Sequence, residues 1–255
     1  MNEYSFPVRD GSMLRVQVFS PIPQGGGKGK YPAIVFWFGG GWMNGTTEQF
    51  FHQAQSFAEN GFVAFIPEYR TYKDGYNFLT DMQDAFDFLQ YLDANAEQFS
   101  VDREGVFLSG GSAGGYLAVS TVMFSQLQNK LKICGLVLFN PVLDTSVHGY
   151  QSRALLEQPW NPIIFSPLHF LYATQSEPMV LPSMLIFHGT DDTTMPFPRI
   201  KLFEEEAERQ NMKVRLCAYS GQEHGFFNYR DGKNPYFEDT LKKALDFCGE
   251  VLKKA

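Results

Sequence analysis

The segment LSGGSAGG, residues 108–115, constrains the fold of this chain more than any other stretch. It contains the pattern Gly-x-Ser-x-Gly, in which Gly110 and Gly114 flank Ser112. The pattern follows a short apolar run and precedes a segment expected to be helical. In that context it predicts a tight turn from strand to helix that raises the serine hydroxyl toward solvent as a candidate nucleophile. The alternative interpretation is an ordinary Gly/Ser loop that caps a helix.

Apolar runs and amphipathic segments alternate along most of the 255 residues. The strands expected from this pattern cover residues 14–19, 33–38, 62–66, 106–108, 135–139, 184–187 and 214–219, and the helices cover 48–60, 78–96, 113–126, 198–211 and 236–253. Such alternation is typical of an α/β protein with a mostly parallel sheet and helices on both faces. Five prolines interrupt the pattern between residues 144 and 182. We therefore expect a single domain over residues 1–255 with a small cap-like insertion at about 144–182.

The composition argues against several classes of partner. The net charge is -7 and no cluster of Lys or Arg is present, so neither nucleic acid nor an anionic membrane surface is expected to bind. The sequence contains no run of about 18 apolar residues, so no membrane-spanning helix is expected. The three cysteines are widely separated and fit no metal site, so no metal is expected. The oligomeric state is left open.

The first ten residues are polar and lack the apolar core of a secretory signal. As the sequence stands we expect a cytoplasmic protein, or a secreted or periplasmic one if a signal has been removed.

A serine nucleophile needs a general base, which an acid must orient. Among the histidines after Ser112, we expect His224 to be the base, because it lies in a polar loop, SGQEHGFFN, before the last helix. We expect Asp192 in HGTDDTTMP to be the acid, with Asp191 as the second candidate. His188 ends a strand and is expected to be a structural hydrogen-bonding residue.

Two other charged residues have a functional and a structural interpretation. Asp144, in NPVLD, is a third carboxylate at a strand end, but a loop-capping role is the stronger interpretation. Arg70, in EYR, could be interpreted as a residue that binds a substrate anion, but the favoured interpretation is a structural ion pair near the glycine loop.

The stretch FWFGGGW, residues 36–42, places three glycines directly after an expected buried strand. Attack on a carbonyl develops negative charge on oxygen, which preorganised backbone N–H groups stabilise. We expect Gly40 and Gly41 to provide two of these donors and Ala113, after the serine, to provide the third. Taken alone, the glycines also fit a plain strand-ending loop.

These motifs together resemble the α/β-hydrolase fold, and more closely the hormone-sensitive-lipase-like esterases and the related bacterial feruloyl and acetyl esterases. The matching stretches are FGGGW, EYR, GGSAGG, FNPVLD, HGTDDTTMPF and GQEHGFFN, in the family's order over nearly the whole chain. The resemblance implies a serine carboxylesterase without a cofactor, with Ser112, Asp192 and His224 as its triad. One departure is Phe38, which stands where the family usually carries a loop-bracing histidine.

The short insertion leads us to expect short acyl groups such as acetyl. Four aromatic residues, Trp42, Trp160, Phe165 and Tyr116, are expected to form a rim suited to a sugar or feruloyl ring, and His169 is a further candidate substrate contact. The expected substrate is thus a small-molecule or carbohydrate ester, including acetylated polysaccharide fragments. The alternatives are an oligopeptidase-like serine hydrolase, although no gating domain is present, and a non-catalytic small-molecule-binding protein.

Overall fold

The computed structural model describes the whole chain except residues 23–28, 125–129, 160, 175–179 and 255. Its described residues form an eight-stranded sheet in the order β1-β2-β4-β3-β5-β6-β7-β8. The strands are β1 Asn2–Pro7, β2 Met13–Phe19, β3 Tyr31–Trp37, β4 Val63–Pro67, β5 Val101–Gly111, β6 Ile133–Phe139, β7 Ser183–Gly189 and β8 Val214–Tyr219. The pairs β1–β2 and β2–β4 are antiparallel, and every later pair is parallel. The carboxyl ends of the six parallel strands, β4, β3, β5, β6, β7 and β8, therefore meet at one edge of the sheet.

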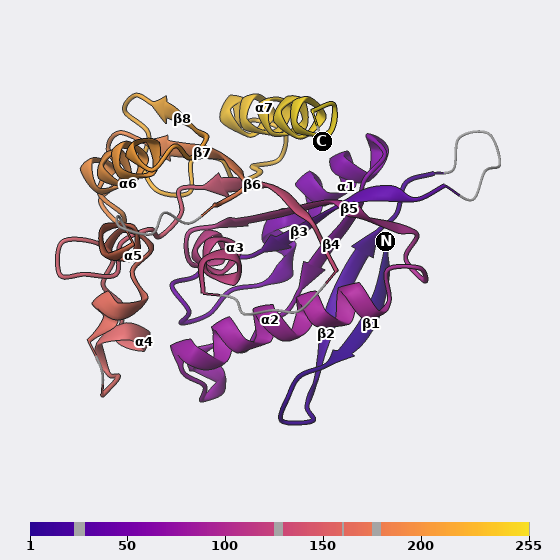
Figure 1. Cartoon of the computed structure of the whole chain (residues 1–255), viewed down its shortest axis with the longest axis horizontal. Coiled ribbons are helices and arrows are strands. Elements are labelled where there is room, and N and C mark those ends of the chain that lie inside the picture. The colour runs from indigo at the N-terminus through magenta and orange to yellow at the C-terminus, as the bar shows by residue number, and fades with distance from the viewer. Residues whose placement is uncertain (23–28, 125–129, 160, 175–179, 255) are drawn as a thin grey trace.

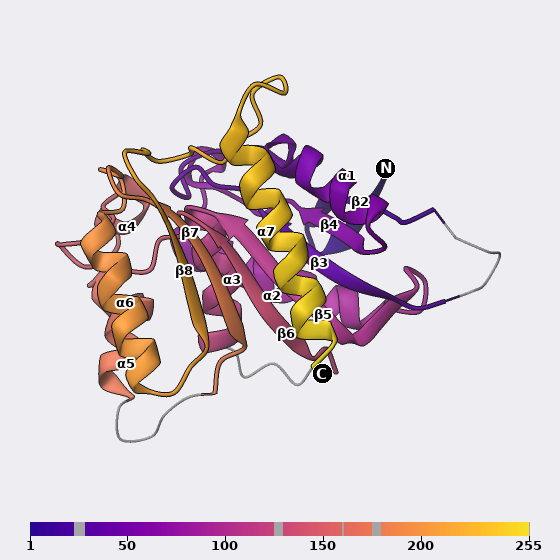
Figure 2. The same ribbon diagram turned by 90° about the horizontal axis from the view of Figure 1, so that it is seen from above.

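Helices cover both faces of this sheet (Figures 1 and 2). They are α1 Phe51–Glu59, α2 Phe78–Ala94, α3 Ala113–Met123, α4 Arg153–Leu156, α5 Pro167–Ala173, α6 Phe197–Arg209 and α7 Pro235–Leu252, with short 3-10 turns at Thr47–Phe50, Tyr72–Asp74 and Pro162–Phe165. One apolar cluster joins α2, α3 and α6 to one face of the sheet, and a second joins α1 and α7 to the other. The expected doubly covered α/β architecture is confirmed.

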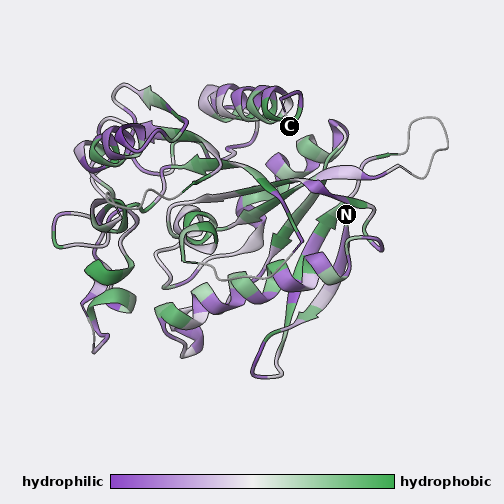
Figure 3. Ribbon diagram, viewed as in Figure 1, coloured by the Kyte–Doolittle hydropathy of each residue, from purple (hydrophilic) through white to green (hydrophobic). Residues whose placement is uncertain are grey.

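The pattern of hydropathy explains this layering. The central strands are apolar on both sides, because each side is covered by helices. Long α2 is instead apolar on one side only, and Figure 3 shows hydrophobic and hydrophilic residues alternating along it. Asn77 begins α2 by accepting hydrogen bonds from the backbone N–H groups of Leu79 and Thr80. The amphipathic pattern and this cap together place the helix against the sheet.

Three features differ from the sequence-based expectation. Strand β1 was not expected; it is an edge strand with mostly exposed side chains, so hydrophobicity gives little signal for it. Strand β5 begins at Val101 rather than 106, because Val101 pairs with Tyr31 of β3 ahead of a register shift. The insertion also contains the short helices α4 and α5, and α5 packs against α3 and α6.

Candidate active site

Ser112 lies on the tight turn between β5 and α3. Its backbone has φ 53° and ψ -117°, a strained conformation for a residue with a side chain. The turn closes only because its neighbours lack side chains. A Cβ on Gly110 would come 2.3 Å from the carbonyl carbon of Gly114, and a Cβ on Gly114 would come 2.0 Å from the carbonyl oxygen of Trp37. The strand-turn-helix expected from the sequence is therefore present.

The structure brings Ser112, His224 and Asp192 into one hydrogen-bonded line. His224 Nε2 lies 2.9 Å from Ser112 Oγ, and His224 Nδ1 lies 2.7 Å from Asp192 Oδ2. Each side chain comes from a loop that follows a different strand, β5, β7 and β8. Since those strands are parallel, their carboxyl ends bring the three loops together. The spacing is that of a nucleophile, a base and an orienting acid.

Asp192 is buried and held as an anion. Its Oδ1 accepts hydrogen bonds from the backbone N–H groups of Thr194 and Met195, each at 2.9 Å. Burial alone would raise the pKa of Asp192, but the hydrogen bond and charge of His224 and the Met195 N–H lower it below the ordinary value. Asp191 is exposed and its Oδ1 accepts from the Thr190 hydroxyl instead.

His188 lies close to the same carboxylate oxygen that His224 contacts. Its Nε2 is 2.8 Å from the carbonyl oxygen of Met195 and 3.3 Å from Asp192 Oδ2. Burial lowers the pKa of His188, which favours a neutral ring that donates from Nε2. The structural hydrogen-bonding role expected from the sequence is present, and it also helps to fix the acid.

The glycines after β3 form a sharply folded loop. Gly40 and Gly41 have φ values of 128° and 64°. A Cβ on Gly40 would lie 1.8 Å from the carbonyl oxygen of Asn44, because Gly40 closes a turn with Met43 and Asn44. Within the described residues, the N–H groups of Gly40 and Gly41 have no protein acceptor. Ala113 begins α3, so its N–H also has no partner within the helix.

Phe38 fixes this loop by packing, in place of a hydrogen-bonding histidine. Its ring stacks on Tyr69 with a centroid separation of 4.2 Å. The Tyr69 hydroxyl donates to the carbonyl oxygen of Phe38 at 2.8 Å. Next along the loop, the Gly39 N–H donates to Gln49 Oε1 at 2.6 Å, and Gln49 Nε2 donates to Asn228 Oδ1 at 3.0 Å. Gln49 thereby links the glycine loop to the loop that carries His224.

The expected aromatic rim is wrong in two of its members. Trp42 and Tyr116 are both fully buried and pack edge to face at 5.2 Å. The Tyr116 hydroxyl donates to the carbonyl oxygen of Phe165. Both rings belong to the core behind the glycine loop, because Phe78 of α2 packs against each of them. Trp160 lies outside the described residues.

His169 is part of a buried polar cluster at the base of the insertion. Its Nδ1 lies 2.9 Å from Ser166 Oγ and 3.5 Å from Asp144 Oδ1. Asp144 is fully buried and also pairs with Arg199 at 2.5 Å. The structure thus places His169 in a structural cluster, with about a quarter of its side chain exposed. The loop-organising role expected for Asp144 is present.

Sequence reasoning missed a fourth side chain at the triad. Asn140 follows β6 with φ 34°, and its Nδ2 lies 3.3 Å from His224 Nε2. Its Oδ1 accepts from the Gly225 N–H at 3.0 Å. Asn140 therefore positions the loop that carries His224 through contacts with both His224 and Gly225. Its place at the end of a buried strand, in FNPVLD, was the available signal.

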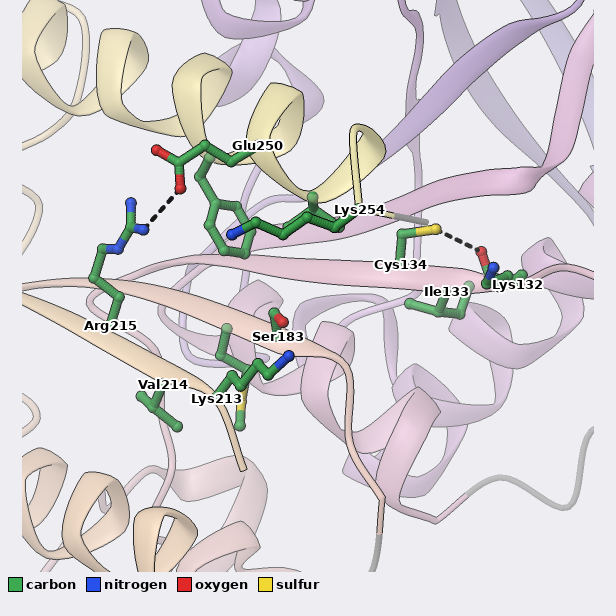
Figure 4. Close-up of a pocket in the computed structure, with 12 residues that line it drawn as sticks. Lys132, Ile133, Cys134, Ser183, Lys213, Val214, Arg215, Glu250 and Lys254 are labelled. Atoms are coloured by element: carbon green, nitrogen blue, oxygen red, sulfur yellow. Dashed lines mark hydrogen bonds and ion pairs between the residues drawn. The ribbon is translucent and has the colours of Figure 1, made fainter. Parts of the chain in front are cut away.

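Two of the hollows in the described structure lie at opposite ends of the parallel strands. One of about 530 Å³ adjoins the glycine loop and is lined by Gly39, Gly40, Gln49, Asn228 and a stacked pair, His52 and Tyr229. Another of about 500 Å³ lies at the opposite end of the strands, between the sheet and the end of α7 (Figure 4). Its cations include Arg215, which pairs with Glu250. No triad residue lines either hollow, but the first one adjoins the glycine loop and Asn228 of the loop that carries His224.

With this geometry in place, the chain can be compared with known proteins. The sequence model of the BD-FAE family matches residues 22–159, and that of the dienelactone hydrolase family matches residues 165–255. The chain belongs to the BD-FAE family of α/β-hydrolases. The esterase resemblance stated from the sequence is confirmed at this level.

Individual relatives agree with this assignment. Solved structures of Thermogutta terrifontis esterase 2, including a propionate-bound form, superpose with a TM-score of 0.85 at 32% identity, covering 98% of this chain and 94% of the other. A probable isoprenylcysteine alpha-carbonyl methylesterase of Arabidopsis thaliana is 24% identical over 89% of this chain and 53% of its own. An ethyl acetate hydrolase of Pseudomonas putida is 28% identical over 62% of this chain and 51% of its own. The chain spans about half the length of these curated relatives.

Among the described residues, no helix is both long and apolar enough to cross a membrane.

Proposed function

We propose that this protein hydrolyses carboxylic esters with short acyl chains through an acyl-enzyme on Ser112. The observation that carries the proposal is the hydrogen-bonded line from Ser112 through His224 to Asp192. Ser112 Oγ attacks the carbonyl carbon while His224 Nε2 takes its proton, and His224 then returns that proton to the departing alkoxide. Water, deprotonated by His224, then attacks the acyl-enzyme, and His224 returns this proton to Ser112 Oγ as the acid is released.

The backbone donors complete this chemistry. The N–H groups of Gly40, Gly41 and Ala113 have no acceptor in the described part of the protein, so they are free to bind an oxyanion. The N-terminus of α3 adds positive potential beside Ser112. Asp192 keeps His224 in the tautomer that accepts a proton at Nε2 and stabilises the imidazolium once it forms. We assign no cofactor to this mechanism.

The preference for short acyl chains rests on packing and on relatives. Trp42 and Tyr116 fill the space behind the glycine loop, which leaves no room there for a long chain. Thermogutta terrifontis esterase 2 has been solved with propionate and with butyrate bound, and another relative is an ethyl acetate hydrolase. The isoprenylcysteine methylesterase relatives indicate a contrasting class, in which the acyl part is large and the alcohol is methanol.

The proposal defines the alcohol group of the ester substrate less narrowly than its acyl group. A carbohydrate ester was expected from an aromatic rim, and the burial of Trp42 and Tyr116 removes two of its members. The hollow beside Gly39 and Gly40, with Tyr229 at its wall, is the space we assign to the alcohol group. Acetylated oligosaccharides therefore stand as one class of substrate to be tested beside simple alkyl and aryl acetates.

The test uses 4-nitrophenyl acetate, butyrate and octanoate with the parent protein and Ser112→Ala. We expect kcat/KM to be highest for acetate or butyrate and to fall at least about 10³-fold in Ser112→Ala. A parent that prefers octanoate would overturn the acyl-chain assignment. A parent with no esterase activity would instead favour a binding protein, and faster cleavage of a peptide amide than of the esters would favour the oligopeptidase-like alternative.

A further inference from the structure

A tyrosine outside the expected triad lies against the glycine loop. A Cβ built on Gly41 would fall 2.0 Å from the hydroxyl oxygen of Tyr150 and 3.1 Å from its Cζ. The phenol oxygen therefore occupies the place that a side chain at position 41 would take. Gly41 has to be glycine in part because Tyr150 fills that place. This puts the hydroxyl beside one of the backbone donors to which the proposed function assigns the oxyanion.

The loop after β6 is folded so as to deliver this side chain. The Tyr150 N–H donates to the carbonyl oxygen of Asp144 at 2.8 Å. A Cβ on Gly149 would lie 2.1 Å from that same oxygen, so the turn is closed tightly onto Asp144. The buried Asp144 side chain is fixed in turn by Arg199. The Tyr150 ring packs on Trp42 at 5.6 Å with an interplanar angle of 63°.

The hydroxyl is in the right state to donate a hydrogen bond. Burial raises the pKa of Tyr150, and the neighbouring Ser152 hydroxyl lowers it by a smaller amount. Tyr150 is therefore a neutral phenol at neutral pH. Ser152 Oγ is buried and has no close hydrogen-bond partner among the described residues, so it is available to donate toward the phenol oxygen. That arrangement leaves the phenol proton for an acceptor in the site.

We propose that the Tyr150 hydroxyl donates a hydrogen bond to the substrate's carbonyl oxygen as that oxygen gains negative charge. It adds a side-chain donor to the backbone donors of Gly40 and Gly41. The phenol keeps its proton, because the proton that the departing alkoxide takes is supplied by His224. The inference rests on the proposed ester hydrolysis at Ser112. Removal of a single oxyanion donor lowers kcat by about 10²–10³-fold in serine hydrolases.

The test is Tyr150→Phe, which removes one oxygen and keeps the ring on Trp42. We expect kcat on 4-nitrophenyl acetate to fall about 10²-fold with KM changed less than about threefold. A trifluoromethyl ketone forms a tetrahedral adduct with a reactive serine, so its inhibition constant should rise by about the same factor as kcat falls. Tyr172→Phe, a partly exposed tyrosine on α5, is the matched control and should leave both values unchanged.

A second variant tests where the hydroxyl lies. Gly41→Ala places its methyl group on the Tyr150 oxygen and should lower the melting temperature and kcat. Adding Tyr150→Phe to Gly41→Ala should restore part of the melting temperature, since the contact at 2.0 Å disappears.

The outcomes separate the two proposals. A parent without esterase activity would contradict the function itself. An active parent whose kcat and ketone inhibition are unchanged in Tyr150→Phe would overturn the role of Tyr150 alone. Loss of kcat with an unchanged ketone inhibition constant would also overturn it, because an oxyanion donor must affect both.

Discussion

At the scale of single residues, Asp81 stands out because it is buried without a partner. It lies in the first turn of α2, is fully buried, and neither carboxylate oxygen has a hydrogen-bond partner among the described residues. Burial, helped by the charge of Asp84, raises the pKa of Asp81 from 3.8 to about 9. Asp81 is therefore protonated at neutral pH. A charged Asp81 would raise the pKa of Tyr69 further, and Tyr69 is the ring that fixes the glycine loop.

This raised pKa makes a prediction about stability. Between pH 3.8 and about 9 the folded protein holds a proton that the unfolded chain has lost. The free energy of unfolding must then fall as pH rises, by at most about 1.4 kcal/mol per pH unit from this group. Asp81→Asn lacks the titrating carboxyl and this pH-dependent contribution. The free energy of unfolding of the variant relative to that of the parent should therefore grow from pH 5 to pH 8. Urea unfolding of both proteins at three pH values measures the difference.

The exposed Asp246 on α7 provides the control for this measurement. Asp246→Asn should show no pH trend of that size, because the Asp246 side chain is exposed in the folded protein and its ion pair with Lys242 is exposed as well. An Asp81→Asn difference that is constant across the range would show that Asp81 is charged in the folded protein.

Residues with a local signal were predictable from the sequence. Ser112, His224 and Asp192 could be named because each lies in a short motif that follows a strand, and chain order fixed their roles. Trp42 and Tyr116 were misplaced because whether a ring is a rim or a core residue depends on which helices close over it. Tyr150 and Gln49 could not be found at all. Their contacts with the glycine loop are made across distant segments, and their own neighbours in the sequence give no sign of them.

At the scale of elements, the glycine loop is held by its neighbours rather than by its own sequence. Tyr69 follows β4, Gln49 lies in the turn before α1, and both bind the loop at its first residues. Gly40 then closes the turn onto Asn44. The sequence indicated that side chains had to be absent here, and the structure shows what occupies the space instead: Asn44 at Gly40, and Tyr150 at Gly41.

We predict that Gly40→Ala abolishes most activity without unfolding the protein. The added methyl group would lie 1.8 Å from the Asn44 carbonyl oxygen, so the turn must open and move the two N–H donors. We expect kcat on 4-nitrophenyl acetate to fall by about 10² or more, while far-UV circular dichroism is unchanged. Gly11→Ala is the matched control, because Gly11 has φ 87° but nothing within 4 Å of its Cβ position. It should cost about 1 kcal/mol of stability and no activity. Equal losses of activity in both variants would contradict this explanation.

The order of elements was largely predictable, and their boundaries less so. Alternating apolar runs and amphipathic segments identified seven of the eight described strands, because buried parallel strands are apolar throughout. Strand β1 could not be predicted, because an edge strand with exposed side chains has no such pattern. The start of β5 could not be predicted either, because its polar residues 102–104 interrupt the apolar pattern.

At the scale of the whole molecule, Arg70 joins three parts of the fold. It follows β4, and its guanidinium pairs with Asp84 of α2 through Nη2 at 2.6 Å and Nε at 2.9 Å. It also pairs with Asp10 in the turn between β1 and β2, and its charge lies 4.5 Å from the ring centre of Tyr76. Arg70 and Asp84 are both buried. The structural ion pair favoured from the sequence is therefore present, and it ties the antiparallel edge of the sheet to α2.

Removal of only one partner should be much worse than removal of both. Arg70→Met leaves Asp84 buried and unpaired, which we expect to cost about 3–5 kcal/mol of unfolding free energy. Combining Arg70→Met with Asp84→Leu replaces the buried pair by apolar side chains, and most of that loss should be recovered. Urea unfolding of the two single variants and the double variant gives the coupling energy directly.

The exposed counterpart is the pair of Arg15, on β2, and Glu68, directly after β4, at 2.5 Å. Arg15→Ala should cost less than about 1 kcal/mol, since solvent screens an exposed pair. If Arg70→Met cost no more than Arg15→Ala, the antiparallel edge would have to be held by strand pairing alone, without help from α2. If it costs several kcal/mol and the double variant recovers, a single buried arginine joins the parts of the fold that hydrophobic patterning leaves weakly specified.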